Sequence, residues 1–347
     1  MATQFRILSI DGGGIRGIIP ALVLAEIERR TGKRIHQLFD LIAGTSTGGI
    51  LALGLAKPNN AGRAQYTARD LVQLYETEGR RIFSRSMLHQ LLALGNLLDK
   101  KYPNEPIEAV LQEYFGEAWL SEALTNVLLT GYEIELREAF FFRSYRARKD
   151  EDYDFLMRDA ARATSAAPTY FEPEAIEKEE KRYVLIDGGM FANNPAMCAF
   201  VDALREFNRN LDDVYMVSLG TGIRTQPLNY QTVKNWGVVS WAQPILSVVF
   251  HGVSETVHYQ TRQILNEIGK PNRYHRLQVP LTQVTQPLDN TSEANISALK
   301  GLAETIIKEN DTEIDAICRN LLPKKRTRQV KSRVAVSTRA RRKTAVR

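Results

Sequence analysis

A serine within a short glycine-containing segment has the clearest potential for covalent chemistry in this chain. Ser46 lies in the segment 44–48, GTSTG, between a short apolar run and a helical pattern. A G-x-S-x-G turn between a strand and a helix exposes the serine hydroxyl, and Gly44 and Gly48 keep side chains away from the neighbouring backbone. The helix N-terminus favours developing negative charge. The pattern therefore predicts that Ser46 is a nucleophile.

A second glycine-rich segment, 11–17 with sequence DGGGIRG, follows another apolar run. Acyl transfer passes through a tetrahedral oxyanion, and the backbone N–H groups of Gly12, Gly13 and Gly14 could approach it closely. Arg16 and the following helix would add positive potential. The segment therefore predicts an oxyanion hole.

The same glycines also match the dinucleotide-binding pattern G-x-G-x-x-G, which expects an acidic residue after the second strand. Asp40 instead precedes the second apolar run, and that reading leaves the segment around Ser46 unexplained. A non-catalytic nucleotide-binding module is the alternative interpretation.

A nucleophilic serine needs a proton acceptor, and Asp187 is the best-placed candidate. It follows the apolar run 183–186 and opens Asp187-Gly188-Gly189. Because the carboxyl ends of parallel strands gather at one edge of a sheet, Asp187 could meet Ser46 there and accept its proton. A plain β-turn at 187–189 is the competing interpretation. None of the histidines lies in a glycine-rich or strand-end context: His36, His89, His251, His258 and His275.

Strand-like and helical patterns alternate along residues 5–222, which predicts an α/β fold with a mainly parallel sheet covered on both faces. The expected strands are 5–10, 41–43, 127–132, 138–145, 183–186 and 215–219. The expected helices are 20–28, 50–55, 68–79, 107–115, 155–163 and 195–208.

The pattern changes after residue 222, so we expect a catalytic core at 5–222, a mainly helical part at 223–322 packed on it, and a tail at 323–347. The stretch 235–254 has no charged residue, but its proline, histidine and serines favour a buried or substrate-covering helix, or contact with a lipid surface, over a membrane span. Apolar residues at helical spacing predict one amphipathic helix over 292–322.

The charge distribution separates the tail from the rest of the chain. Residues 323–347 contain 11 Lys or Arg and no acid, which leaves 35 basic and 40 acidic residues before them. A block of like charges is typically disordered and solvated, and we assign it no catalytic role and expect no nucleic-acid partner. Two cysteines and the absence of a secretory pattern predict a cytoplasmic protein without disulfides.

Several of these segments together resemble the successive motifs of patatin-like phospholipases. They are 11–17, 44–48, ATSAAPTYF at 163–171, and Asp187-Gly-Gly with Asn193-Asn-Pro195, followed by VSLGTG at 217–222. The resemblance implies a three-layer patatin-like fold, a dyad of Ser46 and Asp187, an oxyanion hole at Gly12–Gly14, and hydrolysis of phospholipid acyl esters at the bilayer surface without metal or cofactor. It also implies a structural role for 163–171, with Pro168 shaping a turn.

In its length and its long helical C-terminal part, the chain also resembles bacterial antiphage phospholipases that a cyclic nucleotide activates. This second resemblance implies a cyclic-nucleotide activator, although no nucleotide motif accompanies it. A homodimer is one of the assemblies left open.

Overall fold

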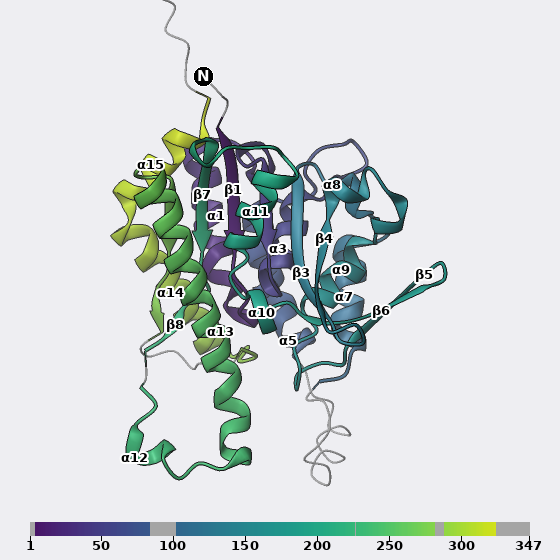
Figure 1. The fold of residues 1–347 in the computed structure, drawn as a ribbon, viewed down its shortest axis with the longest axis vertical. Helices are drawn as coiled ribbons and strands as arrows, with labels where there is room; N and C mark the ends of the chain where they lie inside the picture. The colour runs from purple at the N-terminus through teal and green to yellow at the C-terminus, as the bar shows by residue number, and fades with distance from the viewer. Residues whose placement is uncertain (1–3, 84–101, 226, 282–287, 324–347) are drawn as a thin grey trace, which may run out of the picture.

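The computed structural model describes residues 4–83, 102–225, 227–281 and 288–323, and these contain a central sheet of eight strands (Figure 1). The strand order is β5-β6-β3-β2-β1-β7-β9, with β4 paired to β3. The strands are β1 Phe5–Ile10, β2 Leu41–Gly44, β3 Asn126–Glu133, β4 Glu138–Arg143, β5 Glu174–Lys178, β6 Lys181–Asp187, β7 Val214–Leu219 and β9 Tyr274–Leu277; β8 Ile223–Arg224 and β10 Pro280–Leu281 form a separate pair.

The centre of the sheet is parallel, as the sequence predicted. Strands β3, β2, β1, β7 and β9 all run in one direction, whereas β4, β6 and β5 are antiparallel to their neighbours. The central strands are buried on both faces and consist largely of apolar residues, which is typical of parallel sheets.

Alternate side chains of the central strands point into two hydrophobic layers. In β1, Ile7 packs into one layer and Leu8 and Ile10 into the other, and Leu41 and Ile42 of β2 divide in the same way. Helices cover both layers, so the molecule has the helix–sheet–helix arrangement that was expected. One face is covered by α1, α3 and α9, and the other by α10, α11 and α13 (Figure 1).

The described helices match the predicted positions closely within the core. They are α1 Ile18–Thr31, α2 Ile35–Leu38, α3 Thr47–Ala56, α4 Ala68–Gln73, α5 Gly79–Ile82, α7 Glu105–Phe115, α8 Ser144–Ala147, α9 Met157–Thr164, α10 Gly189–Ala192, α11 Ala196–Arg205, α12 Tyr230–Val233, α13 Val238–Arg262, α14 Glu293–Glu309 and α15 Asp311–Leu321. The single helix expected over 68–79 is interrupted, because residues Leu74–Glu78 form a π-helical turn between α4 and α5.

Two strands of the central sheet were not predicted. Strand β5, with sequence EAIEK, is mostly charged because it lies at the edge of the sheet, where only Ile176 of its side chains is buried. Strand β9, with sequence YHRL, has only four residues and carries a buried arginine. Neither has the apolar run that identifies a buried strand.

Residues beyond 222 contribute directly to the core. Strand β9 pairs with β7 in the central sheet, and α14 and α15 pack against α1. The single amphipathic helix expected over 292–322 is wrong: the chain breaks at Asn310, which joins α14 to α15. The boundary at 222 stays a prediction. The hydrophobic layer around Leu8 contains residues from both sides of this boundary.

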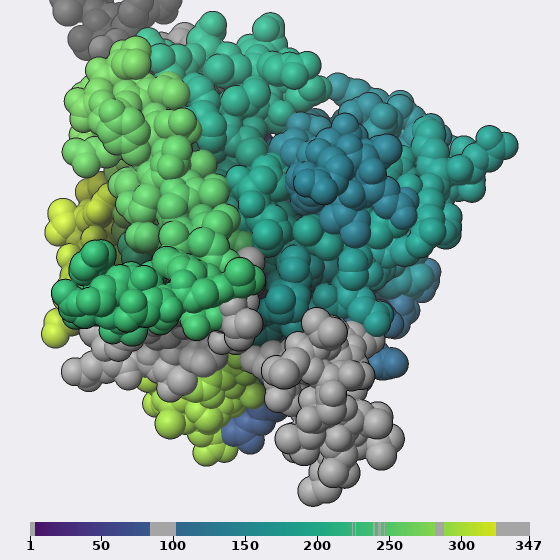
Figure 2. Space-filling view, turned by 60° about the horizontal axis from the view of Figure 1, so that its bottom comes forward, coloured from purple at the N-terminus to yellow at the C-terminus, as the bar shows by residue number. Residues whose placement is uncertain are grey.

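The uncharged stretch 235–254 belongs mostly to α13, which runs on to Arg262. The N-terminal half of this helix, together with α12, projects beyond the carboxyl ends of the parallel strands (Figures 1 and 2). Within the described residues, no helix combines the length and apolar character needed to cross a membrane. The basic tail lies almost entirely outside the described residues.

Candidate active site

Ser46 occupies a sharp turn between β2 and α3. Its backbone has φ 55° and ψ −125°, a conformation that residues other than glycine rarely adopt and that costs about 1–3 kcal/mol. The Ser46 N–H donates to Oγ1 of Thr164 at 3.0 Å, and that hydroxyl donates to the Thr130 carbonyl at 2.7 Å. The surrounding structure therefore holds the strained turn in place.

The two glycines that flank this turn are required by close packing. A methyl group at Gly44 would overlap the carbonyl of Gly48, and one at Gly48 would overlap the carbonyl of Ile10 in β1. The start of α3 consequently lies directly against the ends of β1 and β2. This packing presents the Ser46 side chain at the carboxyl edge of the parallel strands.

Asp187 is buried at the end of β6, and its side chain meets Ser46. Burial raises the pKa of the Asp187 carboxyl from 3.8 to about 6, while the nearby Ser46 hydroxyl and a hydrogen bond from the Gly189 N–H at 2.7 Å lower it partly. A carboxylate with a raised pKa is a better proton acceptor at neutral pH than an ordinary aspartate. Gly188 lies too close to Thr130 for any side chain.

Asp187 reaches the site by a different route from the one predicted. Strand β6 is antiparallel to β3, so Asp187 does not sit at the end of a parallel strand. It pairs with Gly131, two residues beyond Leu129, and Leu129 lies opposite Gly44. The hairpin of β5 and β6 extends outward and then returns to the edge of the sheet, which brings Asp187 to Ser46 from outside.

The glycine-rich segment offers two backbone donors rather than three. The Gly12 N–H donates to the Asn193 carbonyl at 3.0 Å, so the sequence-based choice of Gly12 as an oxyanion donor is not supported. For the N–H groups of Gly13 and Gly14, no acceptor is found among the described residues, and both glycines line the cavity next to Ser46. Gly14 has φ 58°, a left-handed conformation that glycine adopts without strain.

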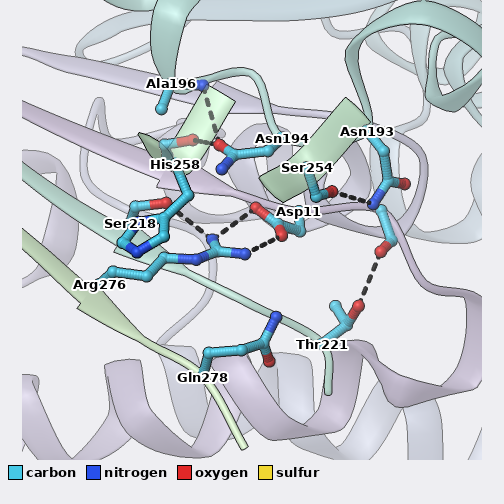
Figure 3. A network of polar contacts seen from close by, with 12 residues as sticks. Asp11, Asn193, Asn194, Ala196, Ser218, Thr221, Ser254, His258, Arg276 and Gln278 are labelled. Atoms are coloured by element: carbon cyan, nitrogen blue, oxygen red, sulfur yellow. Dashed lines mark hydrogen bonds and ion pairs between the residues drawn. The ribbon is translucent and has the colours of Figure 1, made fainter. Parts of the chain in front are cut away.

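A buried ion pair fixes the start of this segment (Figure 3). Arg276 of β9 donates to both carboxylate oxygens of Asp11, at 2.8 and 2.5 Å, and to the Ser218 hydroxyl at 2.8 Å. Burial raises the pKa of Asp11, and the guanidinium of Arg276 opposes that shift. The Thr221 hydroxyl also donates to the Gly12 carbonyl at 2.7 Å.

Ser46 and Asp187 open onto a mainly apolar cavity. About 770 Å³ of empty space lies between its walls when the opening to solvent is included. Its apolar walls come from α3, the π-helical turn, α5, α7, α13 and the segment after α9. They include Ile50, Leu74, Ile82, Ile107, Phe171 and Phe250.

Other predicted site residues have supporting positions. The Nε of Arg16 donates to the Gly13 carbonyl at 3.2 Å, and Arg16 is not among the described residues that line the cavity. No described histidine lines it either, and His89 lies outside the described residues. In the described part of the chain, no group of three or more His, Cys, Asp or Glu could hold a metal ion.

Sequence reasoning missed four residues that shape the site. Thr164 was given only the structural role of its segment and Asn193 no role, yet Thr164 binds the Ser46 backbone and Asn193 binds Gly12 and lines the cavity. Tyr75 lines the cavity and exchanges a 2.6 Å hydrogen bond with Thr47. Arg276 lies in no motif, and only its burial next to Asp11 reveals its importance.

The comparisons with known proteins agree on one family. A family model described as patatin-like phospholipase matches residues 8–200. Patatin-like protein 4 of Arabidopsis thaliana is 31% identical, covering 88% of this chain and 83% of its own length. Patatin-07 of Solanum tuberosum is 30% identical, covering 87% and 83%.

Two further matches limit what similarity alone conveys. A potato relative named probable inactive patatin-3-Kuras 1 is 30% identical, covering 88% of this chain and 87% of its own, so membership does not guarantee activity. Among solved structures, VipD from Legionella pneumophila aligns over 89% of this chain and 67% of its own at a TM-score of 0.35 and 13% identity, which is too distant to carry an argument.

The Asp11–Arg276 pair can be tested with a double-mutant cycle. Arg276→Gln leaves the buried Asp11 carboxylate without its cation and should lower the free energy of unfolding by about 3–5 kcal/mol. Adding Asp11→Asn should recover most of this loss, because no buried charge then remains. Urea unfolding measures both stabilities.

Arg81→Gln, which removes an exposed pair with Glu113, is the control and should change stability by less than about 1 kcal/mol. Equal stability of the single and double variants would contradict a coupled pair.

The raised pKa of Asp187 predicts that this residue reduces stability at neutral pH. Well below pH 3.8 the carboxyl is protonated in the folded and unfolded states, and stability falls as the pH rises from 3.8 through about 6. Asp187→Asn should therefore raise the free energy of unfolding by up to about 3 kcal/mol at pH 8, and by little at pH 4. Denaturant unfolding at both pH values measures the difference. Asp152→Asn, at an exposed carboxyl paired with Lys181, should show no such gain.

Proposed function

The chain belongs to the patatin-like phospholipase family of lipid acyl hydrolases, and we propose that it cleaves acyl esters of membrane phospholipids through Ser46 and Asp187. The observation that carries this proposal is the contact between a strained, partly exposed serine and a buried aspartate whose pKa is raised to about 6. A nucleotide-binding module would need neither feature.

The proposed reaction begins when Ser46 Oγ attacks the ester carbonyl carbon and its proton passes to the Asp187 carboxylate. The N–H groups of Gly13 and Gly14 stabilise the negative charge that develops on the carbonyl oxygen. Asp187 then returns the proton to the departing alcohol, and an acyl ester of Ser46 remains. A water molecule, deprotonated by Asp187, releases the fatty acid and restores the serine.

The cavity beside Ser46 supports an acyl chain as the group that is held. Its walls are mainly aliphatic and aromatic, and Ser46, Asp187 and Asn193 are among the polar residues that line it. An ester carbonyl placed between Ser46 and the glycine amides would therefore direct its hydrocarbon chain toward Leu74 and Ile107. This arrangement suits a fatty acyl ester better than a polar substrate.

The experiment that tests the proposal compares Ser46→Ala and Asp187→Asn with the unaltered chain. Both substitutions should lower kcat for a soluble chromogenic acyl ester by at least about 1,000-fold, since each removes a group needed for covalent catalysis. A fluorophosphonate probe should label the unaltered chain and not Ser46→Ala. Circular dichroism checks that the variants stay folded. Labelling at another residue, or full activity in either variant, would refute the assignment.

The pH dependence provides a separate measurement. Only ionised Asp187 can accept the serine proton, so kcat/KM should rise with pH and level off with a midpoint at about pH 6. A midpoint near pH 4 would mean that burial does not tune this carboxyl in solution.

The role of the cavity can be tested by narrowing it. Ile107→Phe should lower the ratio of kcat/KM for hexadecanoyl over butyryl esters by about tenfold, because the added ring volume leaves less room for a long chain. Ile107→Val, which widens the same wall, is the matched control and should retain activity on the long chain. A parallel loss on both esters in Ile107→Phe would indicate general damage instead of chain selection.

Activation by a cyclic nucleotide and formation of a homodimer stay predictions from the sequence, as does a cytoplasmic location with peripheral membrane contact. Adding cyclic nucleotides to the soluble-ester assay tests the first, and light scattering tests the second. An unchanged rate would contradict activation by a cyclic nucleotide, and a monomeric mass would contradict the homodimer.

A further inference from the structure

Exposed apolar side chains are concentrated in one segment of this molecule. Of the ten large hydrophobic residues that are exposed in the described chain, five lie between residues 228 and 248. They are Leu228, Tyr230, Val238, Ile245 and Val248. A local gathering of this kind marks an interaction surface, whereas single exposed apolar residues need no explanation.

The segment is held next to the catalytic cavity. The middle of α13 is anchored, since Ser254 is buried and its hydroxyl accepts a hydrogen bond from Asn193 at 3.0 Å. Phe250, two residues after the exposed Val248, lines the cavity that contains Ser46. The helix therefore runs continuously from the wall of the cavity into the exposed segment.

The segment 228–248 also projects from the edge of the sheet that carries Ser46. The N-terminal half of α13 and α12 extend past the carboxyl ends of the parallel strands, the edge at which Ser46 lies (Figure 1). Figure 2, which brings this end of the molecule forward, shows the segment in green standing out on that face. A planar surface that approaches this edge of the sheet would meet residues 228–248.

The composition of the segment suits a lipid surface. Residues 214–254 contain no Asp or Glu, and Lys234 is an exposed cation. Two of the three tryptophans of the chain, Trp236 and Trp241, pack edge to face there with ring centroids 5.2 Å apart. Tryptophan and tyrosine favour the membrane–water interface, because an apolar ring and a polar group can both be accommodated there.

We propose that residues 228–248 form the surface by which this protein binds a phospholipid bilayer, lying in the interface without crossing it. The inference rests on the proposed function, because a phospholipase must draw its ester from a bilayer. No described helix is long and apolar enough to span a membrane, which agrees with peripheral insertion of the exposed side chains. Phe250 would then mark the path from the bilayer to Ser46.

The experiment measures binding of the full chain, with Ser46→Ala to prevent hydrolysis, to phosphatidylcholine vesicles by cosedimentation. These vesicles carry no net charge, so the basic tail contributes little attraction. The test variant is Val238→Asp with Ile245→Glu. The control is Tyr259→Asp with Ile268→Glu, which adds the same two charges at exposed positions near the other end of α13. The vesicle partition coefficient should fall by about tenfold or more in the test variant, because two apolar anchors are lost, and stay within about twofold in the control.

With Ser46 intact, the test variant should keep its rate on a soluble short-chain ester and lose about tenfold on vesicles. Unchanged vesicle binding, or an equal loss in the control, would overturn the proposal. A dimer that the test variant converts to a monomer, with vesicle binding retained, would assign this surface to a second copy and overturn it as well. Absence of soluble-ester hydrolysis by the unaltered chain would refute the proposed function alone, since vesicle binding is measured on Ser46→Ala.

Discussion

The buried contact between Asp11 and Arg276 connects the two ends of this fold. Asp11 follows the first strand, and Arg276 belongs to the last strand of the central sheet, 265 residues further along the chain. Each charge would be costly to bury alone, so the glycine-rich segment can take its position only when β9 is in place. The backbone donors next to Ser46 therefore depend on a strand that lies outside residues 8–200, the range matched by the family model.

The site combines several features that oppose stability. Ser46 has a strained backbone, Asp187 is a buried acid, and Gly13 and Gly14 present backbone donors without an acceptor among the described residues. Elsewhere, the strands and the helices that cover them bury apolar side chains in two hydrophobic layers. Local departures of this kind are expected where a structure must be complementary to a transition state, because groups prepared for the reacting atoms are incompletely satisfied without them.

Two parts of α13 have different roles. Its middle supplies Phe250 to the cavity wall and Ser254 to the hydrogen bonds around Asn193, while its first half extends from the body of the protein. The helix continues through Pro244, so a single element reaches from the cavity wall to the exposed residues. The exposed Val238, Ile245 and Val248 thus share one helix with Phe250 of the cavity wall.

Much of the candidate site could be predicted from the sequence because it depends on local geometry. The turn at Ser46, the glycine-rich segment 11–17 and the alternation of strands and helices all follow from short-range sterics and from burial patterns. Ser46 and Asp187 line one cavity, but the predicted route was wrong, since β6 is antiparallel and approaches the edge from outside. Local patterns report where a strand ends but not the direction in which it runs through the sheet.

What the sequence determined by itself was the type of fold, and it named Ser46 and Asp187 as candidates for the nucleophile and its partner. Only the tertiary structure decided that the Gly12 N–H is used by Asn193, that Arg276 neutralises Asp11, and that residues 292–322 form two helices instead of one. It also decided that burial gives Asp187 a pKa of about 6. These properties depend on contacts between residues far apart in the chain and on exclusion of water, and neither is encoded in the spacing of neighbouring residues.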